Sequence, residues 1–246
     1  MSLQKDLELL KDDEQYYRGI GKKYLSNSDI GTLLNDPSLY GIPREDNANF
    51  ALGRLFHYCL IEPEKVDSIV GVDASSRRTN KYTDAVAKAM QPFLLLKKEI
   101  DQIKALANVM KQNESFSSLI YEMGNQYEVP AIKEVMGLLW KGKTDILTND
   151  SIIDLKTTSS IKDFKWNAKK YNYDSQAYLY REFFGKPMIF LVAEKNSNKL
   201  AQFPCAESFY QSGKDKVEKA VEQFHRFFGS NPTEDIKTWY HREELF

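Results

Sequence analysis

The stretch 141-KGKTDILTNDSIIDLK-156 decides the fold, because it predicts a β-hairpin. Residues 141–147 alternate polar and apolar side chains over the length of a strand, and residues 152–156 form a second, more apolar strand. The residues between them, TNDS, are typical of a turn. Upstream, residues 126–132 predict another strand, and residues 133–140 follow it with a break at Gly137. We therefore expect an antiparallel meander of about three strands.

Helices are predicted on both sides of this meander. Upstream, residues 49–60 place apolar side chains at helical spacing, and residues 82–122 indicate two helices. Downstream, the pattern predicts a helix over 173–184, a strand over 187–193 and a long amphipathic helix over 209–228. This order favours an α/β (or α+β) fold, in which a mixed central sheet is flanked by helices.

The chain shows no internal repeat or linker, so we expect a single domain over residues 1–246. Its parts would be a mainly helical segment, a sheet core and a C-terminal helix, over residues 1–122, 123–193 and 194–246.

Composition excludes several classes of protein. The chain has 34 Lys+Arg against 35 Asp+Glu, so a globally basic nucleic-acid binder is not expected. No apolar run reaches the roughly 18–20 residues of a membrane helix, and the charged segment 1–17 does not resemble a signal peptide. Cys59 and Cys205 lack the spacing of a zinc site or of a disulfide framework. We expect a soluble cytoplasmic protein that does not bind membranes.

Asp145, Asp154 and Lys156 are the side chains that indicate chemistry. Asp154 and Lys156 are two residues apart on one strand, so they leave the same face, and the hairpin can bring Asp145 close to them. Carboxylates this close repel each other unless a cation lies between them, and their hard oxygen atoms suit Mg²⁺ or Mn²⁺. A lysine beside such an ion can position and polarise an attacking water. The alternative is an ordinary surface ion pair, which the apolar character of the second strand disfavours.

These residues and four other motifs resemble the PD-(D/E)XK nuclease superfamily. The D…DxK core is formed by Asp145 and 152-IIDLKTT-158, and 176-QAYLY-180 resembles the QxxxY motif of the RecB-type branch. The segments 25-LSNSDI-30 with 36-DPSLY-40, 52-LGRLFHYCLIEP-63 and 141-KGKTD-145 are similar to segments of the phage and prophage exodeoxyribonuclease VIII (RecE-like) group. The likeness spans residues 25–184 and implies a restriction-endonuclease-like core.

The resemblance implies a set of metal ligands and catalytic residues. Asp145 and Asp154 would bind the metal, the Leu155 carbonyl oxygen could be a further ligand, and Lys156 would be the catalytic lysine. His57 matches the upstream metal-binding histidine, although without this context it reads as a core histidine. Glu128 stands where many members have an early catalytic acid, and the nearby Glu134 is an alternative.

Substrate-binding residues are expected in three places. Gln176 and Tyr180, four residues apart on one helix, would contact DNA or the groups around the site, or would simply pack. Two basic segments suit phosphate tracking and the unstacking of a DNA end, with solvated loops as the alternative. They contribute Lys165, Trp166 and Lys169, and Arg77 and Arg78.

Taken together, the residues and the resemblance imply a Mg²⁺- or Mn²⁺-dependent exodeoxyribonuclease. The resemblance further implies 5′→3′ action on linear duplex ends in phage-type recombination, a ring-shaped homo-oligomer, a single-strand annealing protein as partner, and a phage or prophage gene expressed in bacterial cytoplasm. The alternatives are an endonuclease or a catalytically silent DNA-end-binding module on the same fold. A Cas4-like nuclease is excluded, because its iron–sulfur cluster needs about four thiolates.

Overall fold

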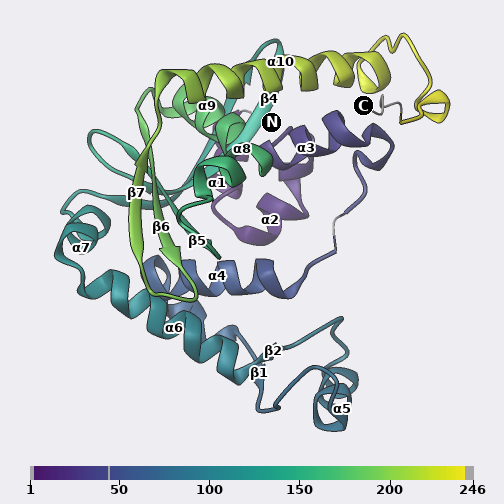
Figure 1. The fold of residues 1–246 in the computed structure, drawn as a ribbon. Helices are drawn as coiled ribbons and strands as arrows, with labels where there is room; N and C mark the ends of the chain where they lie inside the picture. Colours follow the sequence, from purple (N-terminus) through teal and green to yellow (C-terminus); the bar gives the residue numbers. More distant parts are fainter. Residues whose placement is uncertain (1–2, 44, 242–246) are drawn as a thin grey trace.

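A five-stranded mixed sheet forms the centre of the protein (Figure 1). The computed structural model describes residues 3–43 and 45–241, so both ends of the predicted domain and residue 44 lie outside the described residues. The strands follow one another in sheet order and are β3 (Gln126–Val135), β4 (Leu138–Leu147), β5 (Ile152–Thr158), β6 (Met188–Glu194) and β7 (Leu200–Pro204). Within this sheet the β5–β6 pair is parallel and the three other pairs are antiparallel. The predicted mixed sheet with an antiparallel meander is confirmed.

The first hairpin of the meander is longer than the sequence pattern suggested. β3 and β4 pair from Gln126–Leu147 to Val135–Leu138, and only Met136 and Gly137 join them. Both linking residues have positive φ, 53° and 77°, which is the geometry of a tight type I′ turn. Gly137 therefore marks a hairpin turn inside a continuous ladder.

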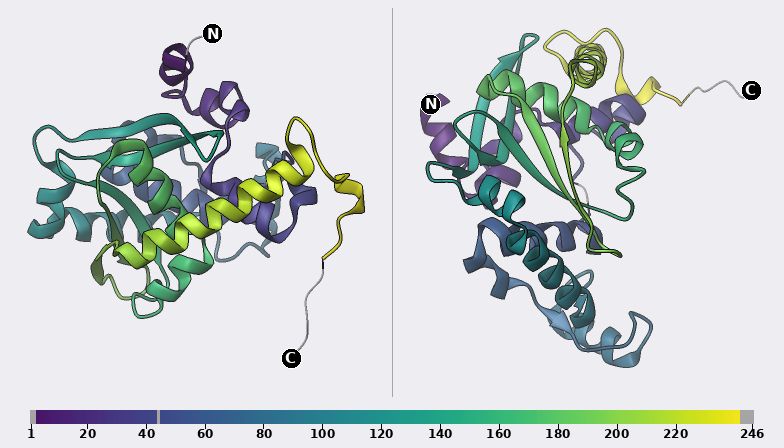
Figure 2. Two further views of the ribbon diagram at one scale, coloured as in Figure 1. Left: turned by 90° about the horizontal axis from the view of Figure 1, so that it is seen from above. Right: turned by 60° about the vertical axis from the view of Figure 1, so that its left-hand side comes forward.

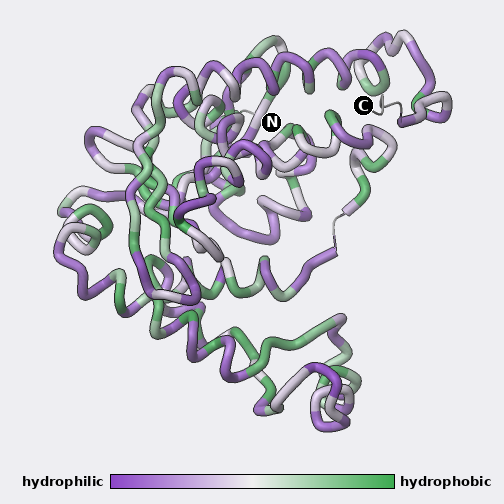
Figure 3. Tube along the Cα trace, in the orientation of Figure 1, coloured by the Kyte–Doolittle hydropathy of each residue, from purple (hydrophilic) through white to green (hydrophobic). Residues whose placement is uncertain are grey.

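Helices cover both faces of the sheet (Figures 1 and 2). The β5 and β6 side chains divide between two cores, because Ile152 and Phe190 belong to one buried cluster while Ile153 and Leu191 belong to the other. A strand buried on both faces reads as a continuous apolar run, and Figure 3 shows hydrophobic residues along these strands. The first cluster packs under α3 (Asn27–Asn35), α9 (Tyr173–Phe184) and α10 (Glu207–Phe228), and the second under α4 (Ala48–Ile61), α6 (Lys97–Gln112) and α7 (Glu114–Tyr121).

Helices α9 and α10 approach each other closely at Gly213. A Cβ atom added there would lie 2.0 Å from the carbonyl oxygen of Asp174, so only glycine fits without moving a helix. Lys216, one turn further along α10, donates hydrogen bonds to Asp174, to the Asn172 side chain and to the carbonyl oxygen of Lys169. These contacts fix the start of α9 against α10.

A pair of glycine substitutions tests this close approach. Gly213→Ala is expected to lower the free energy of unfolding by about 1–3 kcal/mol, because the added methyl group collides with backbone. Gly53→Ala, at a glycine within α4 that has open space around it, is the matched control and should raise stability by about 0.5–1 kcal/mol. Urea denaturation measures both values. Changes of the same sign in the two variants would contradict the packing described here.

Several parts of the fold differ from the expected pattern. Residues 82–122 were expected to form two helices, but the structure has α5 (Asn80–Ala89), α6 and α7, because the Asn113 side chain caps a new helix by accepting from the Phe116 N–H. The short parallel strands β1 (Gly71–Val72) and β2 (Leu95–Leu96) join α5 in a small lobe at one end of α6 (Figure 2). Residues 162–170 contain α8 (Phe164–Lys170), and the predicted C-terminal helical segment also contains β7.

The remaining elements are short. They are α1 (Leu3–Leu9), α2 (Asp13–Tyr17) and the 3-10 helices η1 (Ile20–Lys23), η2 (Pro37–Leu39), η3 (Pro63–Ser68) and η4 (Ile236–Thr238). None of the helices in the described ranges has the length and apolar character needed to cross a membrane.

Candidate metal-binding active site

Three carboxylates lie side by side across strands β3, β4 and β5. The pairs Tyr127–Ile146 and Val129–Thr144 place Glu128 opposite Asp145. On the other side of β4, continuing the antiparallel register by one residue beyond the Ile146–Ile153 pair places Asp145 opposite Asp154 on β5. Like charges that face each other across a ladder are destabilising. A row of three acids therefore needs compensating positive charge.

The strands β4 and β5 separate at the acids. Their ladder contains Leu147–Ile152 and Ile146–Ile153 and goes no further toward the acids. The side chain of Asp145 fills the opening, where its Oδ2 accepts a hydrogen bond from the Leu155 N–H at 2.6 Å. This bond fixes the Asp145 carboxylate between the two strands.

Glu128 adopts a strained backbone conformation within its strand. Its φ is 51°, in the left-handed region that a residue with a Cβ atom rarely occupies. Such strain costs about 1–3 kcal/mol and is found mostly at functional sites. Ligand atoms of Glu128, Asp145 and His57 all lie within 4.8 Å of one another. Glu134, the alternative early acid, is exposed and faces Leu139 at the other end of β3.

His57 reaches the acids from helix α4. Its Nε2 lies 2.8 Å from the Leu155 carbonyl oxygen, and its Nδ1 lies 3.4 Å from Oδ1 of Asp145. Burial lowers the pKa of His57, but the negative charge of Asp145 outweighs this and raises the pKa to about 9. The imidazolium therefore bridges an oxygen atom of Asp145 and the carbonyl oxygen of Leu155, two residues that the family resemblance implies as metal ligands.

The pKa values of the acids have the same physical origin. Burial and the charge of Asp145 raise the pKa of Glu128 to about 7. Burial raises the pKa of Asp154 as well. Burial also acts to raise the pKa of Asp145, but the charge of His57 holds it below its ordinary value. Without a cation, the site compensates its negative charge partly by holding protons.

Lys156 and Gln176 hold Asp154 in place. The Lys156 ammonium lies 2.5 Å from Oδ2 of Asp154, and Gln176 Nε2 donates to Oδ1 at 2.5 Å. Oδ2 is nevertheless buried without an aligned hydrogen bond from the described residues, so it keeps a free lone pair. Burial lowers the pKa of Lys156, but Asp154 outweighs this, so the lysine stays protonated.

Tyr180 lies in the interior of the protein. It is buried, and its hydroxyl donates to the Lys143 carbonyl oxygen at 2.9 Å and accepts from the Lys143 N–H at 3.3 Å. One turn earlier on the same helix, Gln176 binds Asp154. Helix α9 thus ties together the two strands that carry Asp145 and Asp154.

The sequence reasoning did not identify Lys143 or Asp13. The Lys143 ammonium lies 3.2 Å from Oε2 of Glu128 and 2.5 Å from Oδ1 of Asp13, which also pairs with Lys65. Lys143 could have been found from its place two residues before Asp145 on one strand, which puts the two on one face. Asp13 carries no such signal, because it reaches the site from the distant helix α2.

The two basic segments lie in different places. Lys165, Trp166 and Lys169 are on α8, which follows the active-site strand directly. Arg77 and Arg78 are in the lobe formed by β1, β2 and α5, at the far end of α6, and the structure does not bring them to the acids (Figures 1 and 2). Arg77 forms two hydrogen bonds with Glu99.

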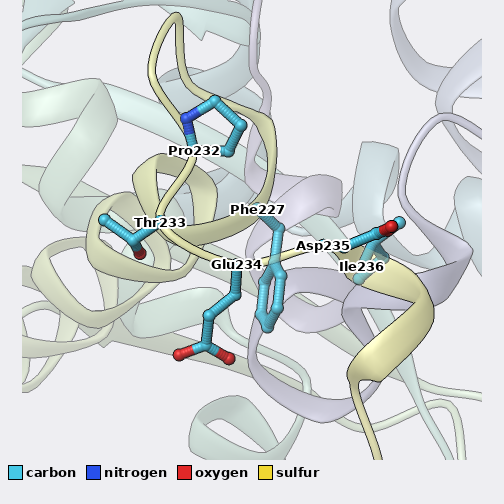
Figure 4. Close-up of a pocket in the computed structure, with 6 residues that line it drawn as sticks. All are labelled: Phe227, Pro232, Thr233, Glu234, Asp235 and Ile236. Carbon is cyan, nitrogen blue, oxygen red and sulfur yellow. The ribbon is translucent and has the colours of Figure 1, made fainter.

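A shallow hollow of about 350 Å³ lies elsewhere, at the end of α10 (Figure 4). It is lined by Phe227, Pro232, Thr233, Glu234, Asp235 and Ile236. Of its two acids, Glu234 is paired with Arg226 and Asp235 accepts a hydrogen bond from the Lys237 N–H, so the hollow offers little free polar chemistry. The acid row remains the candidate site.

The residues of the acid row fit a divalent cation. Three carboxylates, one imidazole and one backbone carbonyl form a hard donor set, and imidazole is tolerated better by Mn²⁺ than by Mg²⁺. The negative charge of this donor set is now offset by the Lys156 ammonium at the buried Oδ2 of Asp154 and by protons held on His57 and Glu128. A cation bound among these groups would take over part of that charge compensation.

The Glu128→Gln variant tests, in the absence of metal, whether the pKa of Glu128 is raised by burial and by Asp145. A carboxyl whose pKa rises from 4.5 to about 7 on folding binds a proton more tightly in the folded state, so its ionisation lowers stability between those pH values. We therefore expect the variant in EDTA to be more stable than the parent by about 2 kcal/mol at pH 8 and equally stable near pH 4.5. Thermal or urea unfolding at the two pH values measures this. A stability difference that does not depend on pH would contradict it.

Comparisons with known proteins agree with this geometry. A family model described as a PDDEXK-like domain of unknown function (DUF3799) matches residues 37–231. The crystal structure of a candidate exonuclease from Eubacterium rectale is 20% identical, with a TM-score of 0.67, over 87% of this chain and 85% of that one. At this identity the likeness supports the nuclease-like fold.

A second solved structure is less similar. A phage-related exonuclease from Haemophilus somnus 129PT is 14% identical, over 82% of this chain and 94% of that one, but its TM-score of 0.35 is too low to indicate the same fold. No protein with a curated description matches the sequence. The family model covers most of the chain, including every residue of the acid row, and its description confirms the resemblance read from the motifs. The chain therefore belongs to the family of PDDEXK-like domains of unknown function.

Proposed function

We propose that this protein is a metal-dependent deoxyribonuclease that degrades linear duplex DNA from its ends. The observation that carries the proposal is the convergence of His57, Glu128 and Asp145, with ligand atoms within 4.8 Å of one another, beside the Asp154–Lys156 pair. Acid clusters that accept a divalent cation next to a protonated lysine suit phosphodiester hydrolysis. The family likeness supports a nuclease of this kind.

The residues of the chain would divide the work. Asp145 and Asp154 would hold Mg²⁺ or Mn²⁺, with His57, Glu128 and the Leu155 carbonyl oxygen as further ligands. When bound, the ion would activate a water and offset the charge of the scissile phosphate. Lys156 would stabilise the negative charge that develops on the phosphate oxygens. Gln176 would keep the Asp154 carboxylate in position through its 2.5 Å hydrogen bond.

Finer features of the proposal follow from the resemblance to the RecE-like group. They are 5′→3′ polarity, a role in phage-type recombination, a ring-shaped homo-oligomer and a single-strand annealing partner. The description of the Eubacterium rectale protein as a candidate exonuclease supports action at DNA ends.

A cleavage assay tests the proposed function. Linear and covalently closed duplex DNA are incubated with Mg²⁺, Mn²⁺ or EDTA. We expect linear DNA to be degraded with either ion and not in EDTA, while closed circles remain intact. Cutting of the circles would favour the endonuclease, and DNA binding without cleavage in any metal would contradict the enzyme. Substrates labelled at the 5′ or the 3′ end then give the polarity.

A further inference from the structure

Helix α8 displays an exposed tryptophan among lysines. It turns Phe164 and Ala168 into the core, while Trp166 is 68% exposed. Two of its lysine neighbours lie three and four residues after it on the helix, at positions that share a helix face. A third lysine directly precedes it, and a fourth lies two residues before α8 begins. These lysines are Lys162, Lys165, Lys169 and Lys170. No ion pair among the described residues occupies any of the four ammonium groups.

The same surface reaches the wall of the candidate active site. Tyr171, at the end of α8, is 57% exposed, and its ring lies 6.1 Å from the ring of Tyr173. The Tyr173 ring in turn lies 4.8 Å from the Lys156 ammonium. A nucleic-acid strand that reaches Tyr171 would therefore be connected to the Lys156 ammonium through two neighbouring aromatic rings, those of Tyr171 and Tyr173. We call Trp166, Tyr171 and the four lysines the α8 surface.

The chemistry of the α8 surface selects one kind of partner. Ammonium groups without an ion pair attract a polyanion. The Lys165 ammonium lies over the Trp166 ring, 4.9 Å from its centroid, so a base can stack on this exposed indole when Lys165 turns to a phosphate. In duplex DNA the faces of the bases are covered by their stacked neighbours, so an internal base cannot reach Trp166. We propose that the α8 surface binds single-stranded DNA, by stacking an unpaired base on Trp166 while the lysines contact phosphates.

The biological role of this surface rests on the proposed function, because an exonuclease that removes one strand of a duplex leaves the other strand unpaired. A strand held on the α8 surface keeps the enzyme at the DNA end between cleavage events. Binding itself needs no metal and no cleavage, so it can be measured independently of activity.

Fluorescence polarisation with the full-length protein in EDTA tests the proposal. The probes are a labelled oligo-dT and a blunt duplex of the same length. We expect Trp166→Ala to weaken binding of oligo-dT about tenfold, within the range known for the loss of one stacked base, and to change duplex binding less than twofold. Trp166→Phe should retain most of the affinity, because it keeps an aromatic face.

Two further variants refine the measurement. Tyr240→Ala removes an aromatic side chain that is 71% exposed but outside the α8 surface, and should leave both affinities unchanged. Lys169→Gln with Lys170→Gln should reduce the salt dependence of oligo-dT binding by about 0.7 in the log–log slope for each lost phosphate contact.

The outcomes separate this proposal from the proposed function. Unchanged oligo-dT affinity in Trp166→Ala, or equal losses for oligo-dT and duplex, would overturn the single-strand surface even if the protein degrades DNA. Selective loss of oligo-dT binding in a protein that degrades no DNA would support the surface and count only against the nuclease.

Discussion

Replacing Lys156 by methionine is expected to slow the degradation of linear duplex DNA by about a thousandfold. Loss of one group that stabilises transition-state charge typically costs a hundred- to a thousandfold in rate, and Lys156 is the ammonium that pairs with Asp154 in the acid row. Methionine keeps the length of the side chain and removes its charge. Initial rates with end-labelled DNA at saturating Mn²⁺ measure the effect.

The control for this variant is a lysine of equal chemistry outside the site. Lys199→Met changes an exposed lysine just before β7 and should leave the rate within about twofold of the parent, as surface substitutions usually do. DNA binding in EDTA reports whether Lys156→Met still presents its DNA-binding surface. A Lys156→Met protein that degrades DNA at more than a tenth of the parent rate would rule out the role assigned to this lysine.

Asp145→Asn is expected to change both stability and metal binding. In the metal-free protein, the Asp145 carboxylate raises the pKa of His57 from 6.5 to about 9. A histidine with a raised pKa contributes stability that is complete below its unfolded pKa and is lost as the pH rises through its folded pKa. About a quarter of the His57 side chain is exposed, so solvent screening reduces the stabilisation that this pKa shift represents. We therefore expect a contribution of about 2–3 kcal/mol.

The variant should therefore be destabilised in a pH-dependent way. In EDTA we expect the free energy of unfolding to fall by about 2–3 kcal/mol at pH 6 and by less than about 1 kcal/mol at pH 10, as measured by urea denaturation. Asparagine can still accept the Leu155 N–H, which isolates the effect of charge. An equal loss at both pH values would show that the ion pair with His57 is not the cause.

The same variant tests the metal site directly. Asp145 is the central acid of the row and lies between Glu128 and Asp154, so its replacement removes the one carboxylate that faces both of the other acids. We expect Mn²⁺ affinity, measured by calorimetry without DNA, to fall at least about a hundredfold, because a neutral amide is a much weaker ligand than a carboxylate. Asp150→Asn, in the turn between β4 and β5, is the matched control and should bind Mn²⁺ as the parent does. Parent-like affinity in Asp145→Asn would exclude the acid row as the metal site.

The parts of the site that could be predicted from the sequence are those that depend on neighbours along the chain. The alternation over 141–147, the TNDS turn and the strand 152–156 predict the β4–β5 hairpin, and the hairpin places Asp145 opposite Asp154. The spacing of Gln176 and Tyr180 follows in the same way from helical periodicity. The predicted helix over 173–184 is confirmed with its bounds unchanged.

Other features could not be predicted, because they depend on contacts between distant segments. The edge strand β7 is short and half-exposed, so its pattern is weak, and it forms because β6 supplies a partner. The α8 segment reads as a basic loop, yet it becomes helical when Phe164 packs on Phe190 and Phe203. Tertiary packing overrides a weak local preference in both cases.

By itself, the sequence determined the meander, its acids and lysine, and the helix that carries Gln176, since strand and helix periods and turn residues act over a few positions. Only the tertiary structure decided how that hairpin becomes a site. The contact between His57 and the Leu155 carbonyl oxygen spans 98 residues, and Lys143 meets Asp13 across 130. The free energy that fixes such contacts comes from burying both faces of one sheet. No local sequence pattern indicates which distant side chain will pack against each face.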